Sequence, residues 1–526
     1  MVRLTALNSI VTLSIVFLLF TLNISQATTY YVDQNHPSAS DANPGTEDLP
    51  WLTIQHAAET IVAGDTVLIR NGVYNEPVST VRSGNSTDGH IVFSAYPGET
   101  PVIDGTGVII SNDGFVVTHS YIKLIGLEIR DWYVGIWMDN AGYVEISDCE
   151  VHHSAFGIGA INGTHDFVLN QVEIHHFFGY GFDASPSGGA DCYNGTFNDC
   201  VAHTGEPGQN VDGFALGHGT QHDFVFNRCK AYDVYDGFDI SARDTTLNSC
   251  LSHDNVSTNY KLWQDNIKLV NCIGYNLGAY GNVALAWTPE RPPDTTTLIN
   301  CTFFNASSYN IYVENSADTL KMYNCIIAGG DNIGLCFETN GVGNYQGDYN
   351  IFHNDNPGRA IVAFGFAEFS LEQIEDGDWT AYSGQDAHSL VVYSDTDLFV
   401  DPANFDLHIL ETSLAVDNGT SDGAPLEDYE GKPRPQGGGY DIGAYEYGEP
   451  GLDPRISVTP VSYDFGSVNI ERASAPQIFT ISSIGKLDLN IFSNLQFPYR
   501  SERRLDGGFR LIGVANRKAI FQRKPL

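Results

Sequence analysis

Three similar segments follow one another in the middle of the chain: Asn-Val-Asp-Gly-Phe-Ala-Leu-Gly at 210–217, Tyr-Asp-Gly-Phe-Asp-Ile-Ser at 235–241 and Thr-Asn-Tyr-Lys-Leu-Trp at 258–263. If each segment is the same strand in successive turns of a coil, Phe214, Phe238 and Tyr260 lie in one column. Stacked parallel strands lie roughly 4.8 Å apart, so residues in successive segments become first neighbours. This alignment predicts a coiled chain in which one type of strand returns in every turn.

A longer repeat supports the coil. After Tyr121, small apolar residues recur at intervals of 21 to 29 residues. Each follows directly after a short run of β-strand type in which apolar and polar residues alternate. They are Leu127, Cys149, Val172, Cys200, Cys229, Cys250, Cys272, Cys301 and Cys325. Such self-similarity is typical of a solenoid, and the two-residue alternation within each repeat makes it a β-solenoid. The 53 glycines and 12% aromatic residues fit short strands joined by tight turns.

The recurring cysteines predict an inward ladder of small side chains, one for each coil. Stacked neighbours point the same way, which is a poor geometry for disulfides; the pairing of Cys192 and Cys336, which lie off the ladder, stays open. A second column follows three positions after the ladder: His152, His175, His203, Tyr232, His253, Tyr275 and Phe304. Because tyrosine and phenylalanine share this slot with histidine, stacked rings are favoured over a metal site.

The start of the chain and its net charge indicate where the protein acts and which partners it can have. Residues 1–27 combine Arg3, an apolar run from Ile10 to Leu22 and a small-residue exit at Ala27, which predicts a cleaved signal peptide and a protein secreted to the medium or the cell surface. No later segment is long and apolar enough to span a membrane. The net charge of −38 excludes nucleic acid as a partner, and a polyanionic glycan would need a local cation.

Domain boundaries follow from the pattern. We expect a β-helix over 28–448, with a short helix at 54–62 covering its first strand, coils to about Phe352, an irregular stretch at 353–397 and a closing segment up to Tyr447. Residues 449–455 form a linker. Residues 456–526 are too few for a sandwich of about 100 residues, and alternation ends after Asn494, where eight of the 26 basic residues crowd beyond Pro498. A small, incomplete β-sandwich is expected there.

The same alignment gathers charged residues. It places Asp239 and Lys261 in one column with Ala215, and Asp212 and Asp236 in another. Two aspartates in adjacent coils lie close enough to share a hard cation, and a lysine in the next coil would feel its charge. Asp-Gly pairs are common turn formers, but three successive coils carrying acid, acid and base in one slot favour a functional site.

These segments resemble polysaccharide lyase family 9, whose pectate lyases are right-handed parallel β-helices that bind Ca²⁺ through four aspartates and use a lysine as base. The fold resemblance covers residues 30 to about 450, and 456–494 resembles the first strands of hydin-like immunoglobulin-like domains. The resemblance implies Asp212, Asp236 and Asp239 as calcium ligands and Lys261 as the base. Tyr235 stands where the family has a further aspartate, and Asp233 is the candidate replacement.

The implied chemistry is β-elimination on a uronate. A base removes the proton at C5, and a cation neutralises the neighbouring carboxylate, whose charge opposes the reaction. Arg243 is a candidate to clamp a uronate carboxylate. We therefore expect a secreted, monomeric, Ca²⁺-dependent lyase that acts on an acidic, pectate-like polysaccharide. A glycoside hydrolase on the same β-helix, or a non-catalytic surface or adhesion protein, are the alternatives.

Overall fold

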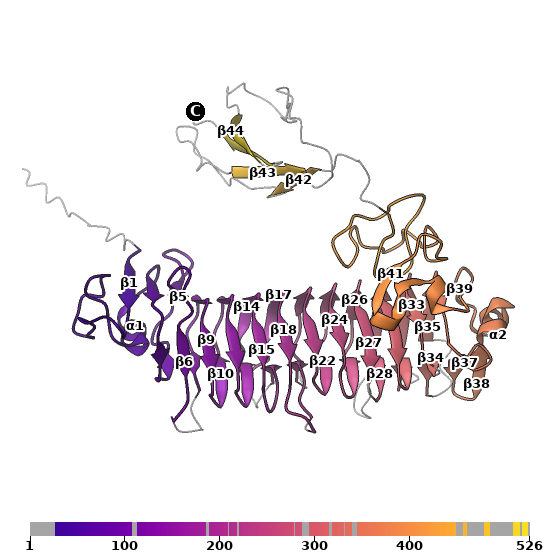
Figure 1. Cartoon of the computed structure of the whole chain (residues 1–526), viewed down its shortest axis with the longest axis horizontal. Coiled ribbons are helices and arrows are strands. Elements are labelled where there is room, and N and C mark those ends of the chain that lie inside the picture. Colours follow the sequence, from indigo (N-terminus) through magenta and orange to yellow (C-terminus); the bar gives the residue numbers. More distant parts are fainter. Residues whose placement is uncertain are drawn as a thin grey trace, which may run out of the picture.

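The computed structural model describes residues 27–448, except 108–112, 186–188, 209, 218–219, 278, 287–293, 315–317, 331 and 339–343, together with four strands beyond residue 448. Three long sheets run side by side along the solenoid, and each complete coil adds one strand to each of them (Figure 1). All pairings in the three sheets are parallel except the last one of the second sheet, where β38 runs antiparallel to β37. The all-β parallel solenoid predicted from the repeat is therefore confirmed.

The first sheet contains β1 (Thr29–Val32), β2 (Thr66–Ile69), β5 (Ile91–Ala95), β8 (Ile122–Ile125), β11 (Val144–Ser147), β14 (His165–Asn170), β17 (Tyr193–Asn198), β20 (Val225–Asn227), β23 (Thr246–Asn248), β26 (Ile267–Val270), β29 (Thr295–Ile299), β32 (Thr319–Tyr323) and β35 (Tyr345–Asp348). The second contains β4 (Val78–Ser79), β7 (Phe115–Val117), β10 (Val134–Asp139), β13 (Phe156–Ile161), β16 (Phe182–Ala184), β19 (Phe214–Leu216), β22 (Asp236–Ile240), β25 (Thr258–Leu262), β28 (Gly281–Leu285), β31 (Tyr309–Val313), β34 (Ile333–Phe337), β37 (Ala360–Phe364) and β38 (Ala367–Ser370). The third contains β3 (Val73–Tyr74), β6 (Val102–Asp104), β9 (Glu128–Arg130), β12 (Glu150–His152), β15 (Glu173–His175), β18 (Val201–His203), β21 (Lys230–Tyr232), β24 (Leu251–His253), β27 (Ile273–Leu277), β30 (Thr302–Ala306), β33 (Ile326–Ala328), β36 (Ile351–Phe352) and β39 (Leu390–Val391).

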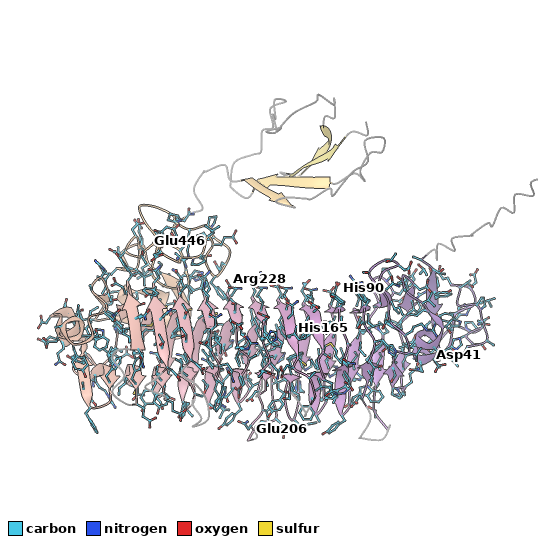
Figure 2. All side chains as sticks on the ribbon, turned by 180° about the vertical axis from the view of Figure 1, so that it is seen from behind. Asp41, His90, His165, Glu206, Arg228 and Glu446 are labelled. Atoms are coloured by element: carbon cyan, nitrogen blue, oxygen red, sulfur yellow. The ribbon has the colours of Figure 1, made fainter. Side chains whose placement is uncertain are left out.

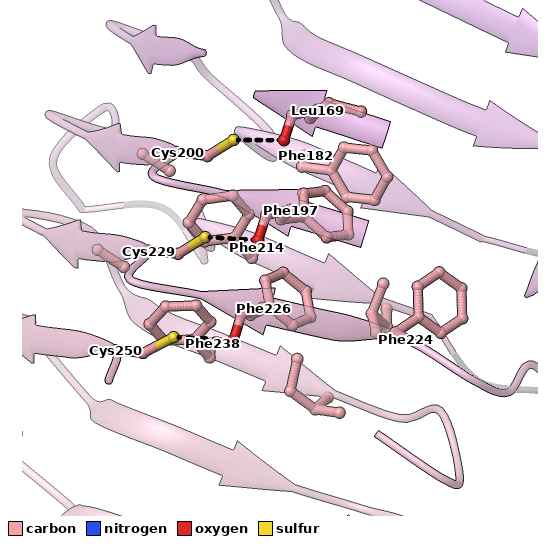
Figure 3. Packing of buried hydrophobic residues seen from close by; sticks show 14 of the residues in the cluster. Leu169, Phe182, Phe197, Cys200, Phe214, Phe224, Phe226, Cys229, Phe238 and Cys250 are labelled. Atoms are coloured by element: carbon pink, nitrogen blue, oxygen red, sulfur yellow. Dashed lines mark hydrogen bonds between the residues drawn. The ribbon is translucent and has the colours of Figure 1, made fainter. Parts of the chain in front are cut away.

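The core is built from columns of like residues. Figure 3 shows Cys200, Cys229 and Cys250 one above another beside stacked phenylalanines, and the Cys200 Sγ lies 3.4 Å from the carbonyl oxygen of Leu169. All nine cysteines are buried and unpaired, as predicted for the ladder. The ring column is also confirmed: the His152 and His175 rings stack at 4.8 Å. Each buried phenylalanine contributes about 1.5–3 kcal/mol of hydrophobic stabilisation.

The residue before each ladder position takes a left-handed backbone conformation, which lets the chain turn sharply from the first sheet into the third. Asn271, for example, has φ 52° before Cys272, and Asn300 has φ 51° before Cys301. Asparagine and aspartate tolerate this conformation better than most other residues. Their frequent appearance directly before the ladder residue therefore follows from the turn that every coil repeats.

The ends of the solenoid are covered by other elements. Helix α1 (Ile54–Thr60) lies within the expected range 54–62, and Thr53 caps it by accepting from the backbone N–H of His56. The stretch 353–397, expected to be irregular, instead contains β37 to β39 and helices α2 (Leu371–Glu375) and α3 (Asp378–Ser383). This prediction was wrong because a Ser370/Gln373 capping box starts α2 and the fully buried Trp379 anchors α3.

The closing segment follows, with the short helices η2 (Asp395–Asp397) and η3 (Pro402–Asn404) and the hairpin strands β40 (Phe399–Asp401) and β41 (Asp406–Ile409). Figure 2 places Glu446 in these loops, at one end of the solenoid. The Asn271 side chain donates to the Glu427 carbonyl at 2.7 Å. Inside the segment, Arg434 and Glu446 form a fully buried ion pair at 2.8 Å. The Asn271–Glu427 hydrogen bond holds the segment against the coils, and the Arg434–Glu446 pair holds the segment together.

Beyond residue 448, β42 (Ile456–Thr459), β43 (Ile478–Ser483), β44 (Phe509–Ala515) and β45 (Lys518–Arg523) form a small antiparallel sheet in the order β42-β43-β45-β44. Within the stretch 456–494 that resembles the first strands of an immunoglobulin-like domain, residues 460–477 and 484–494 lie outside the described residues, and so does the predicted signal peptide 1–27 except for its last residue. Two strands thus form after Asn494, while the incomplete sandwich stays a prediction. In the part of the chain that the structure describes, no helix has the length and apolar character of a membrane span.

Candidate active site

The register predicted from the repeated segments is confirmed in the second sheet. Phe214 of β19 pairs with Phe238 of β22, which pairs with Tyr260 of β25, and all three rings are buried. Successive side chains on a strand point to opposite faces, so the residues after these rings face outward. Asp239 therefore stands directly beside Lys261 on the outer face.

Three carboxylates meet at this point on the outer face. One carboxylate oxygen from each of Asp212, Asp236 and Asp239 lies within 4.8 Å of the others. Asp212 is 2% exposed and Asp236 is fully buried. The Asp212 carboxylate accepts a hydrogen bond of 3.2 Å from the backbone N–H of Asp236, so the chain itself fixes the distance between the first two acids.

Lys261 supplies the positive charge of this cluster. Its Nζ donates to Asp236 Oδ2 at 2.9 Å and to Asp239 Oδ2 at 3.3 Å, and its side chain is 22% exposed. The same Nζ lies 5.1 Å from the centre of the Trp263 ring. The lysine is thus held between two acids at the edge of solvent.

Burial and mutual repulsion shift the pKa values of the groups in this cluster. Burial raises the pKa of Asp212 to about 8, and the negative charges of Asp236 and Asp239 add to this rise. Burial also raises the pKa of Asp239. For Lys261, burial alone would lower the pKa, but the charges of Asp239 and Asp236 outweigh it and raise the pKa above its usual range. One ammonium group does not balance three crowded carboxylates.

This donor set fits a hard divalent cation. Calcium prefers carboxylate and carbonyl oxygens as ligands. Asp236 Oδ1 is buried and has no hydrogen-bond partner among the residues that the structure describes, which is costly unless a further positive group approaches it. Asp212, Asp236 and Asp239 therefore have the chemistry and the spacing to hold Ca²⁺.

Two other predicted residues lie apart from the cluster. The Arg243 guanidinium is 48% exposed and pairs with Asp244 at 2.8 Å, in the turn that leads back to the first sheet. Asp233 is exposed, with a left-handed φ of 52°, and is not one of the three grouped carboxylates. Asp233 is therefore not part of this carboxylate cluster.

The structure adds residues that the sequence analysis missed. Asp183 pairs with Ala215, which pairs with Asp239, so Asp183 occupies the same outward column two strands earlier. Tyr312 occupies it two strands after Lys261. The signal for Asp183 was available, because Gly181-Phe182-Asp183 repeats the Gly-Phe-Asp order of 237–239. Tyr312 gave no such signal, since its segment lacks the Gly-Phe pair.

Comparisons with known proteins agree with this geometry. The family described as "Pel9A-like, right handed beta helix region" matches residues 30–350. The uncharacterised protein YwoF of Bacillus subtilis is 45% identical over 73 residues, 14% of this chain and 15% of the relative. Pectate lyase PEL9 of Emericella nidulans is 24% identical over 209 residues, 39% of this chain and 48% of the relative. The chain thus aligns with about half or less of the length of these curated relatives.

Two solved structures share the fold. The crystal structure of pectate lyase Pel9A superposes with a TM-score of 0.51 at 14% identity, covering 81% of this chain and 98% of that one. The complex of XylC with xylose gives 0.52 at 13% identity, covering 79% and 98%. At such identity the likeness concerns the fold alone. The repeat, the parallel coils and the family match over most of the solenoid together show that the chain belongs to the Pel9A-like right-handed β-helix family.

Proposed function

We propose that this protein is a calcium-dependent polysaccharide lyase that cleaves a uronate-containing, pectate-like polysaccharide by β-elimination. The observation that carries the proposal is Lys261 held at 2.9 Å from Asp236 and 3.3 Å from Asp239 on an exposed face, with Asp212 grouped beside them. The names of the pectate lyases among the similar proteins support the same reaction class.

Lys261 is the proposed base. In its neutral form Nζ takes the C5 proton of the uronate; the electron pair left behind forms the C4–C5 double bond, and the C4–O4 bond breaks with a proton passing from water to the leaving oxygen. Calcium held by Asp212, Asp236 and Asp239 would supply positive charge next to the uronate carboxylate. The acids that raise the pKa of Lys261 in the substrate-free protein must therefore be neutralised before Lys261 can act.

The surroundings suggest how the polymer is held. The outward column runs along the solenoid axis from Asp183 past Lys261 to Tyr312, so a polysaccharide lying along the axis follows it and contacts one strand after another. Tyr312 stacks on Tyr309 with ring centroids 4.9 Å apart, and this aromatic surface beside the column is of the kind against which a sugar can pack. Arg243 remains our proposed clamp for a uronate carboxylate, which requires its exposed guanidinium to leave Asp244. Its role is separate from proton transfer.

We also propose the remaining features expected from the sequence: a signal peptide at 1–27 with secretion of a monomer, a catalytic β-helix over 28–448, a linker at 449–455 and an incomplete immunoglobulin-like sandwich at 456–526. Nucleic acid is not a proposed partner.

The direct test is to incubate the purified protein with pectic, alginate and glycosaminoglycan polymers, with calcium or with chelator, and to follow the ultraviolet absorbance of an unsaturated product. Absorbance that rises only with calcium and a uronate polymer supports the lyase. New reducing ends without this absorbance would favour a glycoside hydrolase. Binding to a polymer without cleavage would favour the adhesion function.

A further inference from the structure

A buried histidine faces two carboxylates near the C-terminal end of the solenoid, away from the lyase site. His353 follows β36 in the third sheet, Asp355 lies two residues later, and Asp395 begins η2 after β39. One ligand atom from each of the three lies within 4.8 Å of the others. His353 is only 1% exposed, whereas the Asp355 side chain is 51% exposed, so the group opens to solvent on one side.

The hydrogen bonds of the ring indicate what the histidine can bind. His353 Nδ1 lies 2.9 Å from the carbonyl oxygen of Val392, and since a carbonyl only accepts, Nδ1 carries the proton. In a neutral ring Nε2 then presents a lone pair, yet Nε2 lies 3.1 Å from Asp355 Oδ1. A lone pair beside a carboxylate is favourable only with a positive centre between them, either a second proton on the ring or a metal ion.

The arrangement has the form of a metal site. Histidines that bind metals commonly donate their other ring N–H to a backbone carbonyl, which fixes the tautomer. The Val392 carbonyl performs this task for His353. Asp355 is also held in place: its Oδ2 accepts from the backbone N–H of Gly330 at 3.0 Å, which leaves Oδ1 directed at the histidine.

We propose that His353, Asp355 and Asp395 bind a divalent transition metal of the zinc type. One imidazole nitrogen and two carboxylates suit Zn²⁺, with water from the open side as a further ligand. Calcium is disfavoured here because it prefers oxygen ligands throughout. The ion joins the turn after β36, the last strand but one of the third sheet, to the segment after β39 that leads into the closing hairpin, so it stabilises the C-terminal end of the solenoid independently of the lyase reaction.

The test uses the full chain after metal has been removed with chelator. Calorimetry measures the binding of Zn²⁺, and thermal unfolding with and without Zn²⁺ measures its effect on stability. Asp395→Asn keeps the side-chain shape, and Asp397→Asn, an exposed aspartate in the same short helix, is the matched control. An Asp236→Asn background removes zinc that the lyase carboxylates could take up. His353→Gln is less informative because the buried ring contributes to packing.

We expect one zinc ion per chain in the Asp236→Asn background and in its Asp397→Asn derivative. Asp395→Asn should weaken binding by more than the 10- to 100-fold that loss of an outer-shell partner commonly costs, and zinc should no longer raise its unfolding temperature. Anomalous scattering at the zinc edge should place the ion at His353 Nε2. Unchanged zinc affinity in Asp395→Asn, or no binding before that substitution, would overturn the proposal.

Discussion

Replacement of Lys261 by alanine tests both the reaction and the electrostatics of the site. The substitution removes the ammonium group that lies 2.9 Å from Asp236 and 3.3 Å from Asp239. Loss of a general base typically costs about 10²- to 10⁴-fold in turnover, so the variant should be nearly inactive. No core side chain is lost, because Lys261 faces outward from β25, and the solenoid should remain folded.

The stability of the variant carries the second part of the test. Removing one partner of a buried ion pair commonly costs about 3–5 kcal/mol, because the other charge is left uncompensated. Since the Lys261 side chain is 22% exposed, water screens part of the loss and we expect about 3 kcal/mol or less in chelator. Calcium should restore much of this loss if the three carboxylates bind it.

The assay compares initial rates of unsaturated product and urea unfolding curves, each with calcium and with chelator. Lys268→Ala, a half-buried lysine on β26 of the first sheet, is the matched control and should retain full activity. The rate of the parent protein should rise with pH until the amine is largely neutral. Near-full activity in Lys261→Ala, or products without a C4–C5 double bond, would refute the assignment of the base or of the lyase reaction.

Three further predictions follow from the same structure. Asp236→Asn should abolish the stabilisation of the folded protein by calcium, which amounts to about 2.7 kcal/mol at a calcium concentration 100 times the dissociation constant. The control Asp233→Asn, at an exposed aspartate, should keep this stabilisation. Equal calcium-dependent shifts of the melting temperature in the two variants would contradict the calcium site. Burial raises the pKa of Asp441 to about 6, so between about pH 4 and 6 the folded state holds this proton and the unfolded state does not. As the pH rises through this range, Asp441 should therefore lower the free energy of unfolding by up to about 1.4 kcal/mol per pH unit. Asp441→Asn should make that slope shallower in urea titrations without removing it, because burial also raises the pKa of Asp212 to about 8 and that of Glu446 to about 7; an unchanged slope would show that Asp441 does not contribute. Proteolysis within 449–455 should release a β-helix with unchanged melting temperature and activity, unless residues 456–526 form a complete domain packed against it.

The sequence by itself determined the coil and the register of its centre. The cysteine ladder and the turn residue before it recur once in every coil, at intervals of 21 to 29 residues, with the repeated Gly-Phe slot between them, and a parallel solenoid brings such equivalent positions into contact on neighbouring strands. Asp239 and Lys261 were therefore predictable neighbours, as the pairing of β22 with β25 shows. The same rule would have revealed Asp183, had the Gly-Phe pattern been followed one coil further back.

Only the tertiary structure decided where the side chains outside the repeat point. Arg243 follows β22 by a few residues, yet it pairs with Asp244 in a turn, and the helices within 353–397 depend on the burial of Trp379. His353 and Asp395 meet although nothing in their spacing relates them. These contacts join segments that do not share a strand position, so packing between distant parts of the chain sets them and no sequence period records it.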